Sequence, residues 1–341
     1  MKADEFFVSL KQGAPKVCYL FEGEEEYLKE RALEQLRAQI LSGPMGSMNE
    51  TVLNDPSADE LIPCCETLPM MADRRLVIVK DSSLLSCSKE GGKRSDKDAD
   101  QIVNYLKRLP DSVCLVFFCR GKANGTRKLY KQIVKMDAAV QFEQLRNDAL
   151  IKWIAREMKA YGKQVSRTTA EKLIFFAGNE LASLKAEVAK VCAFAGDRET
   201  VEESDIDTIC TMTAEYKVFD LSDKVVEGKA DEAIELMHHL IGGGEQRLAL
   251  LALLVRQYRQ LLFMALLPNK ANAAQVLGVP PFVARKLGMA IRGFTWQELK
   301  NAYDLCVRTE YLVKSGQMPE EGSLEKVIYE LLHMRAGRIK G

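Results

Sequence analysis

The sequence predicts an α/β domain built on a parallel sheet, followed by two all-α domains. Short apolar runs alternate with helical periodicity up to about residue 146, and beyond that point the strand-like runs stop. Strands that alternate with helices are typical of a parallel sheet with helices on its faces. A chain of 341 residues suits more than one domain. We therefore expect three domains, over residues 1–146, 147–212 and 213–341.

Four strands are expected in the first domain, each a short apolar run. They are residues 17–22, 76–79, 113–119 and 140–142. The first run is followed by Gly23 and a strongly helical stretch over 24–41, which predicts a strand–turn–helix unit. Further helices are expected at 100–109 and 127–136. The polar, glycine-bearing tract over 86–100 is expected to be a mobile loop.

The rest of the chain has the periodicity of amphipathic helices. Those expected in the second domain are residues 148–161, 168–178, 180–194 and 202–210. Thr168 and Ser204 are candidate capping residues near helix starts. In the third domain, the helix expected at 245–267 is apolar on most sides. We therefore expect it at the centre of a helical bundle or at an interface.

The composition disfavours several classes of protein. Lysine plus arginine (48) balances aspartate plus glutamate (48), and zero net charge argues against a protein whose main role is to coat nucleic acid. No apolar run reaches the length of a bilayer span, and the acidic, amphipathic start does not resemble a secretion signal. We expect a cytoplasmic protein that makes no membrane contact.

The nine cysteines are scattered through apolar segments without paired CxxC spacing. Buried free thiols in a reducing compartment are the expectation, and a metal site is not expected. The histidine pair His238-His239 is expected on a helix surface. We expect no catalytic residues and no cofactor.

The strand–turn–helix unit stands where a nucleotide-binding domain would carry its phosphate loop, G-x-x-x-x-G-K-[ST]. In that register the chain has Gly23, Leu28, Lys29 and Glu30. The glutamates at 24–26 repel an anion, and Leu28 blocks the close backbone approach that glycine permits. Glu30 cannot replace the hydroxyl that would hold magnesium. We expect a phosphate loop that no longer binds nucleotide, with Lys29 solvated and paired with nearby glutamates. An active P-loop-type NTPase is the alternative.

A second feature is the apolar pair Met70-Met71. The preceding run over 64–68 is expected to end a helix, and Pro69 should interrupt it after Leu68. Two adjacent side chains on a turn cannot both point fully into one core. Methionine is flexible and polarisable, which suits a pocket on a partner. The alternative is that both side chains pack beneath the sheet.

Five segments spread over nearly the whole chain form a recognisable set. They are YLFEGEE with YL over 19–28, LPMMADRRLV over 68–77, GNEL with Leu184, Glu187 and Lys190 over 178–190, VFDL over 218–221, and LGVPPFVARKL over 277–287. These segments resemble the delta subunit of the bacterial DNA polymerase III clamp loader. Each match is moderately specific, and together they follow the order of the family.

The resemblance implies an AAA+-like first domain that does not hydrolyse ATP, a small helical lid-like second domain, and a C-terminal helical collar. The collar would pack in a ring with the ATPase and delta-prime subunits of the DNA-directed DNA polymerase holoenzyme. In that family two hydrophobic residues at a helix tip enter a pocket of the β sliding clamp and open it for loading onto primed DNA. By register these are Met70 and Met71, flanked by Leu68 and Pro69; other members carry bulkier Leu or Phe.

A helix-turn-helix DNA-binding regulator is a further alternative, because residues 274–287 resemble that motif. Its would-be recognition helix opens with Pro280-Pro281-Phe282, where base-reading side chains are expected.

A basic cluster of Arg120, Lys122, Arg127 and Lys128, continued by Lys131 and Lys135, is a candidate DNA-facing surface. The alternative is a solvated helix face.

Overall fold

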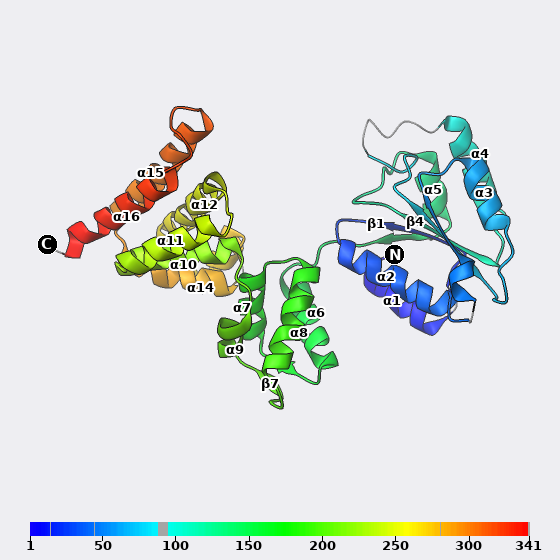
Figure 1. Ribbon diagram of the computed structural model, residues 1–341, viewed down its shortest axis with the longest axis horizontal. Helices are drawn as coiled ribbons and strands as arrows, with labels where there is room; N and C mark the ends of the chain where they lie inside the picture. Colours follow the sequence, from blue (N-terminus) through cyan, green and yellow to red (C-terminus); the bar gives the residue numbers. More distant parts are fainter. Residues whose placement is uncertain (14, 44, 88–94, 280, 340–341) are drawn as a thin grey trace. The chain divides into compact units, whose positions relative to one another are not determined.

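A computed structural model describes residues 1–13, 15–43, 45–87, 95–279 and 281–339. The chain divides into two compact units, Met1–Leu145 and Arg146–Gly341 (Figure 1). This division falls next to the predicted end of the first domain. Residues 88–94 of the tract that was expected to be a mobile loop, and Pro280 of the proposed helix-turn-helix, lie outside the described residues.

The first unit is built on a five-stranded parallel sheet in the order β2-β3-β4-β1-β5. Its strands are β1 (Cys18–Glu22), β2 (Glu50–Asn54), β3 (Arg75–Lys80), β4 (Val113–Phe118) and β5 (Ala139–Gln141). The predicted α/β class is confirmed. The sequence prediction missed β2, an edge strand whose side chains are partly exposed, so that it lacks the apolar run of a central strand.

Helices flank both faces of this sheet. They are α1 (Ala3–Gln12), α2 (Glu26–Ile40), α3 (Ala58–Glu66), α4 (Asp96–Leu106) and α5 (Lys128–Lys135), with a 3₁₀ turn, η1, over Gly46–Asn49. Figure 1 shows α1 and α2 on one side of the sheet and α3, α4 and α5 on the other. Helix α4 begins before its predicted start because the Ser95 hydroxyl accepts from the Asp98 N–H in a capping box.

Alternate residues of β1 supply the cores of the two faces. Leu20 packs into the cluster formed by β3, β4, α3, α4 and α5. Its neighbour Phe21 points to the other face, where its ring centroid lies 5.2 Å from that of Phe6 and 5.1 Å from that of Phe142. This alternation is what a strand buried on both faces requires, and it fixes the position of the turn that follows at Gly23.

The second unit starts with the four predicted helices. They are α6 (Asn147–Ala160), α7 (Arg167–Ala177), α8 (Leu181–Phe194) and α9 (Glu203–Ile209). The expected caps were each wrong by two positions: Ser166 caps α7 and Glu202 caps α9, because Thr168 and Ser204 already lie inside the first turn. A short parallel pair, β6 (Gln164–Val165) with β7 (Thr200–Val201), also departs from the all-helical prediction.

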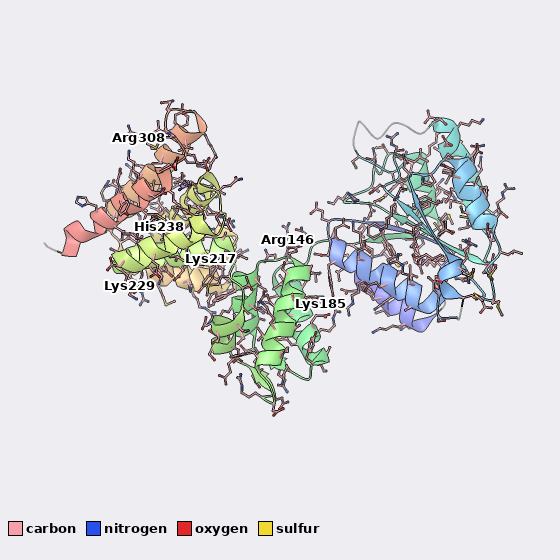
Figure 2. All side chains as sticks on the ribbon, in the orientation of Figure 1. Arg146, Lys185, Lys217, Lys229, His238 and Arg308 are labelled. Carbon is pink, nitrogen blue, oxygen red and sulfur yellow. The ribbon has the colours of Figure 1, made fainter. Side chains whose placement is uncertain are left out.

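The remaining helices form a bundle. They are α10 (Ala214–Glu227), α11 (Ala230–Gly242), α12 (Arg247–Leu266), α13 (Ala273–Leu277), α14 (Pro281–Ala290), α15 (Trp296–Lys314) and α16 (Ser323–Ile339), with 3₁₀ turns η2 (Lys270–Asn272) and η3 (Ile291–Gly293). In Figure 2, His238 lies on α11, where its side chain is exposed as expected.

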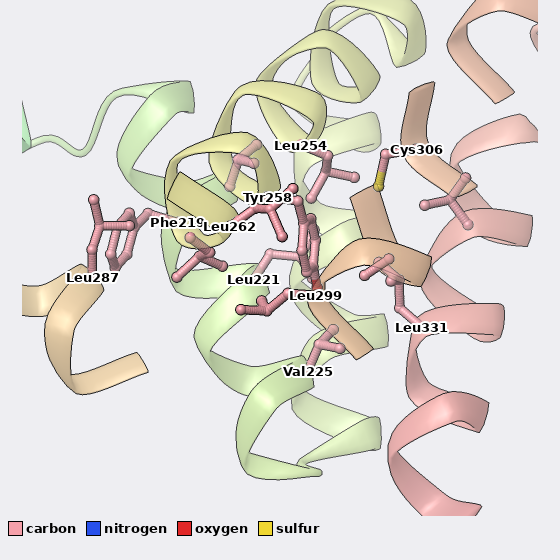
Figure 3. Close-up of a cluster of buried hydrophobic side chains, with 14 of the residues drawn as sticks. Phe219, Leu221, Val225, Leu254, Tyr258, Leu262, Leu287, Leu299, Cys306 and Leu331 are labelled. Carbon is pink, nitrogen blue, oxygen red and sulfur yellow. The ribbon is translucent and has the colours of Figure 1, made fainter. Parts of the chain in front are cut away.

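Helix α12 is the central helix of this bundle, as predicted. It packs against α10, α14, α15 and α16, and Leu254, Tyr258 and Leu262 project from it into the core (Figure 3). By length and composition α12 is the one helix among the described residues that could cross a membrane. Its apolar character is explained by burial within the bundle.

Lys286 on α14 joins three helices of the second unit. Its ammonium lies over four aromatic rings, those of Phe219 (5.0 Å), Tyr216 (5.1 Å), Phe175 (5.7 Å) and Phe282 (6.0 Å). The carboxylate of Asp223 on α10 lies 3.9 Å from the same ammonium. Burial raises the pKa of Asp223 to about 6. Since Phe175 belongs to α7, these contacts tie α7 to the bundle, and the separate domains at 147–212 and 213–341 stay a prediction.

All nine cysteines are free thiols, and seven of them are buried. Burial raises the pKa of the Cys65 and Cys114 thiols to about 12. The predicted buried thiols are confirmed for the majority, with Cys64 partly buried and Cys87 exposed.

Candidate functional site

The turn after β1 uses its backbone donors within the protein. The Gly23 N–H donates to the Gly121 carbonyl at 2.8 Å, and the Glu25 N–H donates to the Phe142 carbonyl at 3.1 Å. A phosphate loop works because such N–H groups point outward at an anion. Here these two groups already have partners in the neighbouring chain segments.

Gly23 has a packing role of its own. Its φ of +116° lies in a region that L-residues rarely adopt. A Cβ at this position would lie 2.1 Å from the Phe142 carbonyl oxygen. The retained glycine of the phosphate-loop register is therefore explained by the close approach of two backbone segments.

Lys29 is fully buried, so the expectation that it is solvated was wrong. Its Nζ donates to the Cys119 carbonyl at 2.7 Å and to Glu26 Oε1 at 2.6 Å, and it lies 5.2 Å from the Phe118 ring centroid. The expected pairing with a glutamate is confirmed. The ammonium is buried because the end of β4 offers a carbonyl and an aromatic face, which together compensate for lost water. Leu28 is buried as well.

A depression of about 300 Å³ lies beside this lysine. It is lined by Glu26, Glu30, Lys80, Asp81, Phe118 and Arg120. Three of these six side chains are carboxylates, and Arg120 lies 3.3 Å from Asp81. The cationic groups are thus offset by acidic neighbours, a charge pattern that disfavours a triphosphate.

The first four residues of the predicted basic cluster, Arg120, Lys122, Arg127 and Lys128, differ in their surroundings. Arg120 and Lys128 have acidic partners, and Lys128 Nζ lies 2.8 Å from Asp100. Lys122 is exposed, whereas Arg127 is partly buried at the start of α5. Ion pairing offsets part of the positive charge of this surface. Its contact with DNA stays a prediction.

The most exposed apolar group of the first unit is the turn at residues 68–71, here called the methionine turn. The exposed fractions are 78% for Leu68, 50% for Met70 and 77% for Met71, and Pro69 is half-buried. The alternative that both methionines pack beneath the sheet was therefore wrong.

The methionine turn follows α3 as irregular chain, and the helix ends at Glu66 rather than continuing to Leu68. The Thr67 N–H and hydroxyl both donate to the Pro63 carbonyl, at 3.1 and 2.8 Å. These bonds cap the last turn of the helix, and the chain then leaves in an extended conformation. Met71 has a φ of +49°, which is uncommon for a residue with a side chain.

Asn49, at the end of η1, hydrogen-bonds to the backbone of the methionine turn. Its Oδ1 accepts from the Met70 N–H at 2.7 Å, and its Nδ2 donates to the Met70 carbonyl at 2.9 Å. The side chain is fully buried. Asn49 was not among the predicted site residues, because nothing local marks a polar residue whose partner lies 21 positions along the chain.

Comparisons with known proteins agree over both units. A family model described as DNA polymerase III, delta subunit, matches residues 19–143, and one described as DNA polymerase III delta subunit, C-terminal domain, matches residues 215–331. The DNA polymerase III subunit delta of Bacillus subtilis (strain 168) is 26% identical over 331 residues, 95% of each chain.

A solved structure, the DNA clamp loader delta protein of Bacillus subtilis, superposes with a TM-score of 0.60 at 24% identity. The match covers 97% of this chain and 99% of that chain. At this level of identity, the likeness establishes a shared fold.

Proposed function

The chain belongs to the delta-subunit family of DNA polymerase III, and from this membership we propose that it binds the β sliding clamp and opens the ring for loading onto primed DNA. It would act in the cytoplasm, within an assembly that contains the clamp-loader ATPase subunits and the delta-prime subunit. The methionine turn would supply the grip, and the helical bundle would supply the collar.

The observation that carries this proposal is the exposure of two adjacent methionines on a turn whose backbone is fixed. Because Met70 is already half-buried and Met71 is mostly exposed, burying the remaining surface of both contributes roughly 2–4 kcal/mol before ordering costs. That amount can bias a strained ring interface between closed and open states, while nucleotide on neighbouring subunits controls access to the turn.

ATP hydrolysis would belong to the neighbouring subunits. Two N–H groups of the turn after β1 are already hydrogen-bonded, and Lys29 is turned inward onto the Cys119 carbonyl. Rebuilding a phosphate site would require breaking these contacts. An active P-loop-type NTPase is disfavoured for this reason, and a magnesium–ATP titration showing micromolar affinity would restore it.

A helix-turn-helix DNA-binding regulator is disfavoured by the packing of α14. Val283 and Leu287 on this helix lie in the bundle core, and Phe282 contacts Lys286. A recognition helix must present its side chains to the major groove, whereas these are engaged within the protein.

Ring opening is tested by clamp release. Clamp preloaded on nicked circular DNA is incubated with the isolated chain, and the clamp that remains on DNA is measured. We expect release by the native chain and by Met289→Ala, which removes another exposed methionine on α14. We expect no release at the same concentration by a chain with Met70→Ala and Met71→Ala. Equal release by the double variant would remove the methionine turn from this role.

A further inference from the structure

We propose that Asn49 is a positioning residue for clamp binding: it fixes the backbone of Met70 and so holds the methionine turn in the conformation that binds. This inference rests on the proposed function. Asn49 itself is fully buried and would not touch the clamp, so it would act only through the turn.

The contact joins the Asn49 carboxamide to both the N–H and the carbonyl of Met70. One end of the Asn49 carboxamide accepts from the Met70 N–H at 2.7 Å and the other end donates to the Met70 carbonyl at 2.9 Å. The same Nδ2 lies 3.4 Å from the Met45 carbonyl. If the carboxamide were flipped, its NH₂ group would face the Met70 N–H and its oxygen would face the Met70 and Met45 carbonyls. The three contacts therefore fix its orientation.

The methionine turn needs such an anchor because residues 68–71 lie in neither helix nor strand. No ladder of backbone hydrogen bonds therefore sets the direction of its side chains. Met71 also holds a positive φ of +49°, a conformation that persists only where the surroundings impose it. The Asn49 contact lies one residue before this position and fixes the peptide groups that lead into it.

Preorganisation is the consequence for binding. A turn that samples many conformations must lose that freedom when its side chains enter a pocket, and the loss weakens affinity. Asn49 would remove this cost in advance, because the turn is already ordered in the free chain. The partner surface that benefits is an apolar pocket wide enough for two flexible side chains.

The first test is clamp affinity of the full chain with Asn49→Ala. We expect binding to weaken by about tenfold, the range for losing buried hydrogen bonds that order a binding segment. Hydrogen exchange at the Met70 amide should become faster in the free protein. Asn49→Asp keeps the shape of the side chain but replaces the Nδ2 donor with an oxygen. That oxygen would face the Met70 and Met45 carbonyls, so this variant should weaken binding at least as much.

Arg37→Ala is the matched control. It removes the 2.7 Å ion pair between Arg37 and Glu50, the residue next to Asn49, and leaves the contacts to Met70 in place. We expect clamp affinity close to that of the native chain. A loss equal to that of Asn49→Ala would show that any local destabilisation suffices, and would overturn the positioning role.

A double-mutant cycle with Met71→Ala distinguishes a positioning role of Asn49 from a smaller folded fraction of the Asn49→Ala variant. If Asn49 acts through the turn, Asn49→Ala should weaken binding less in the Met71→Ala background than in the native one. An equal factor in both backgrounds, or native affinity for Asn49→Ala and Asn49→Asp, would refute the inference. If Met71→Ala combined with Met70→Ala leaves affinity unchanged, the proposed function of the turn itself is refuted instead.

Discussion

Substitution of Lys29 distinguishes a structural lysine from a phosphate-binding one. Lys29→Met keeps most of the buried stem but removes the ammonium, which donates to the Cys119 carbonyl and to Glu26. The Cys119 carbonyl would then lose its charged donor, at a cost of about 1.5–3 kcal/mol. The contact with the Phe118 ring adds about 0.5–1 kcal/mol, and the half-exposed Glu26 pair adds little.

We therefore expect the free energy of unfolding of the first unit to fall by roughly 2–4 kcal/mol. Both tryptophans lie in the second unit, at Trp153 and Trp296, so their fluorescence does not report on the first unit. Hydrogen exchange of the amides in β1 and β4 measures it directly.

Nucleotide affinity is the second readout. In a working phosphate loop the lysine contacts the phosphates, so Lys29→Met would abolish nucleotide binding while leaving stability nearly unchanged. We expect the opposite pattern, with faster exchange in β1 and β4 and no change in a magnesium–ATP titration. Native exchange rates together with a loss of ATP binding would refute the structural role of Lys29.

Two further predictions concern backbone packing and pH. Gly23→Ala should destabilise the first unit by more than about 2 kcal/mol, because the new Cβ would lie 2.1 Å from the Phe142 carbonyl oxygen and the backbone φ there is +116°. Urea titration followed by circular dichroism measures this loss. An unchanged unfolding midpoint would contradict the close approach of the two backbone segments. Asp223 has a folded pKa raised from 3.8 to about 6, mainly by burial, so between these values the folded chain holds a proton that the unfolded chain has released. Its contribution to stability therefore falls as the pH rises from about 4 to about 6. Asp223→Asn should make the unfolding free energy of the second unit less dependent on pH across this range. Urea unfolding followed by tryptophan fluorescence measures this, and an unaltered pH dependence would exclude Asp223 as its source.

The parts of the fold that the sequence predicts well are those fixed by local pattern. The apolar runs of β1, β3 and β4 are buried on both faces, so their composition alone identifies them. The edge strand β2 was missed because its side chains are all partly or fully exposed, so its sequence has no such apolar run. Capping residues were misplaced because the preference for Ser or Thr does not distinguish the cap from the first turn.

The candidate site shows the same limit. Two adjacent apolar residues after a proline are local information that singled out Met70 and Met71 but left open whether they are exposed or packed beneath the sheet; the structure shows both exposed. The burial of Lys29 depends on the Cys119 carbonyl, 90 residues away. The anchor at Asn49 depends on a residue beyond the next helix. Long-range contacts of this kind decide whether a charged or polar residue faces water, and they are absent from local sequence pattern.

The most direct test of clamp binding by the methionine turn is a calorimetric titration of sliding clamp with the isolated chain. We predict that Met70→Ala with Met71→Ala weakens the affinity by at least about 30-fold, the equivalent of the lower bound on the burial free energy, while Met289→Ala binds as the native chain does. Equal affinities for the native chain and the double variant would contradict it.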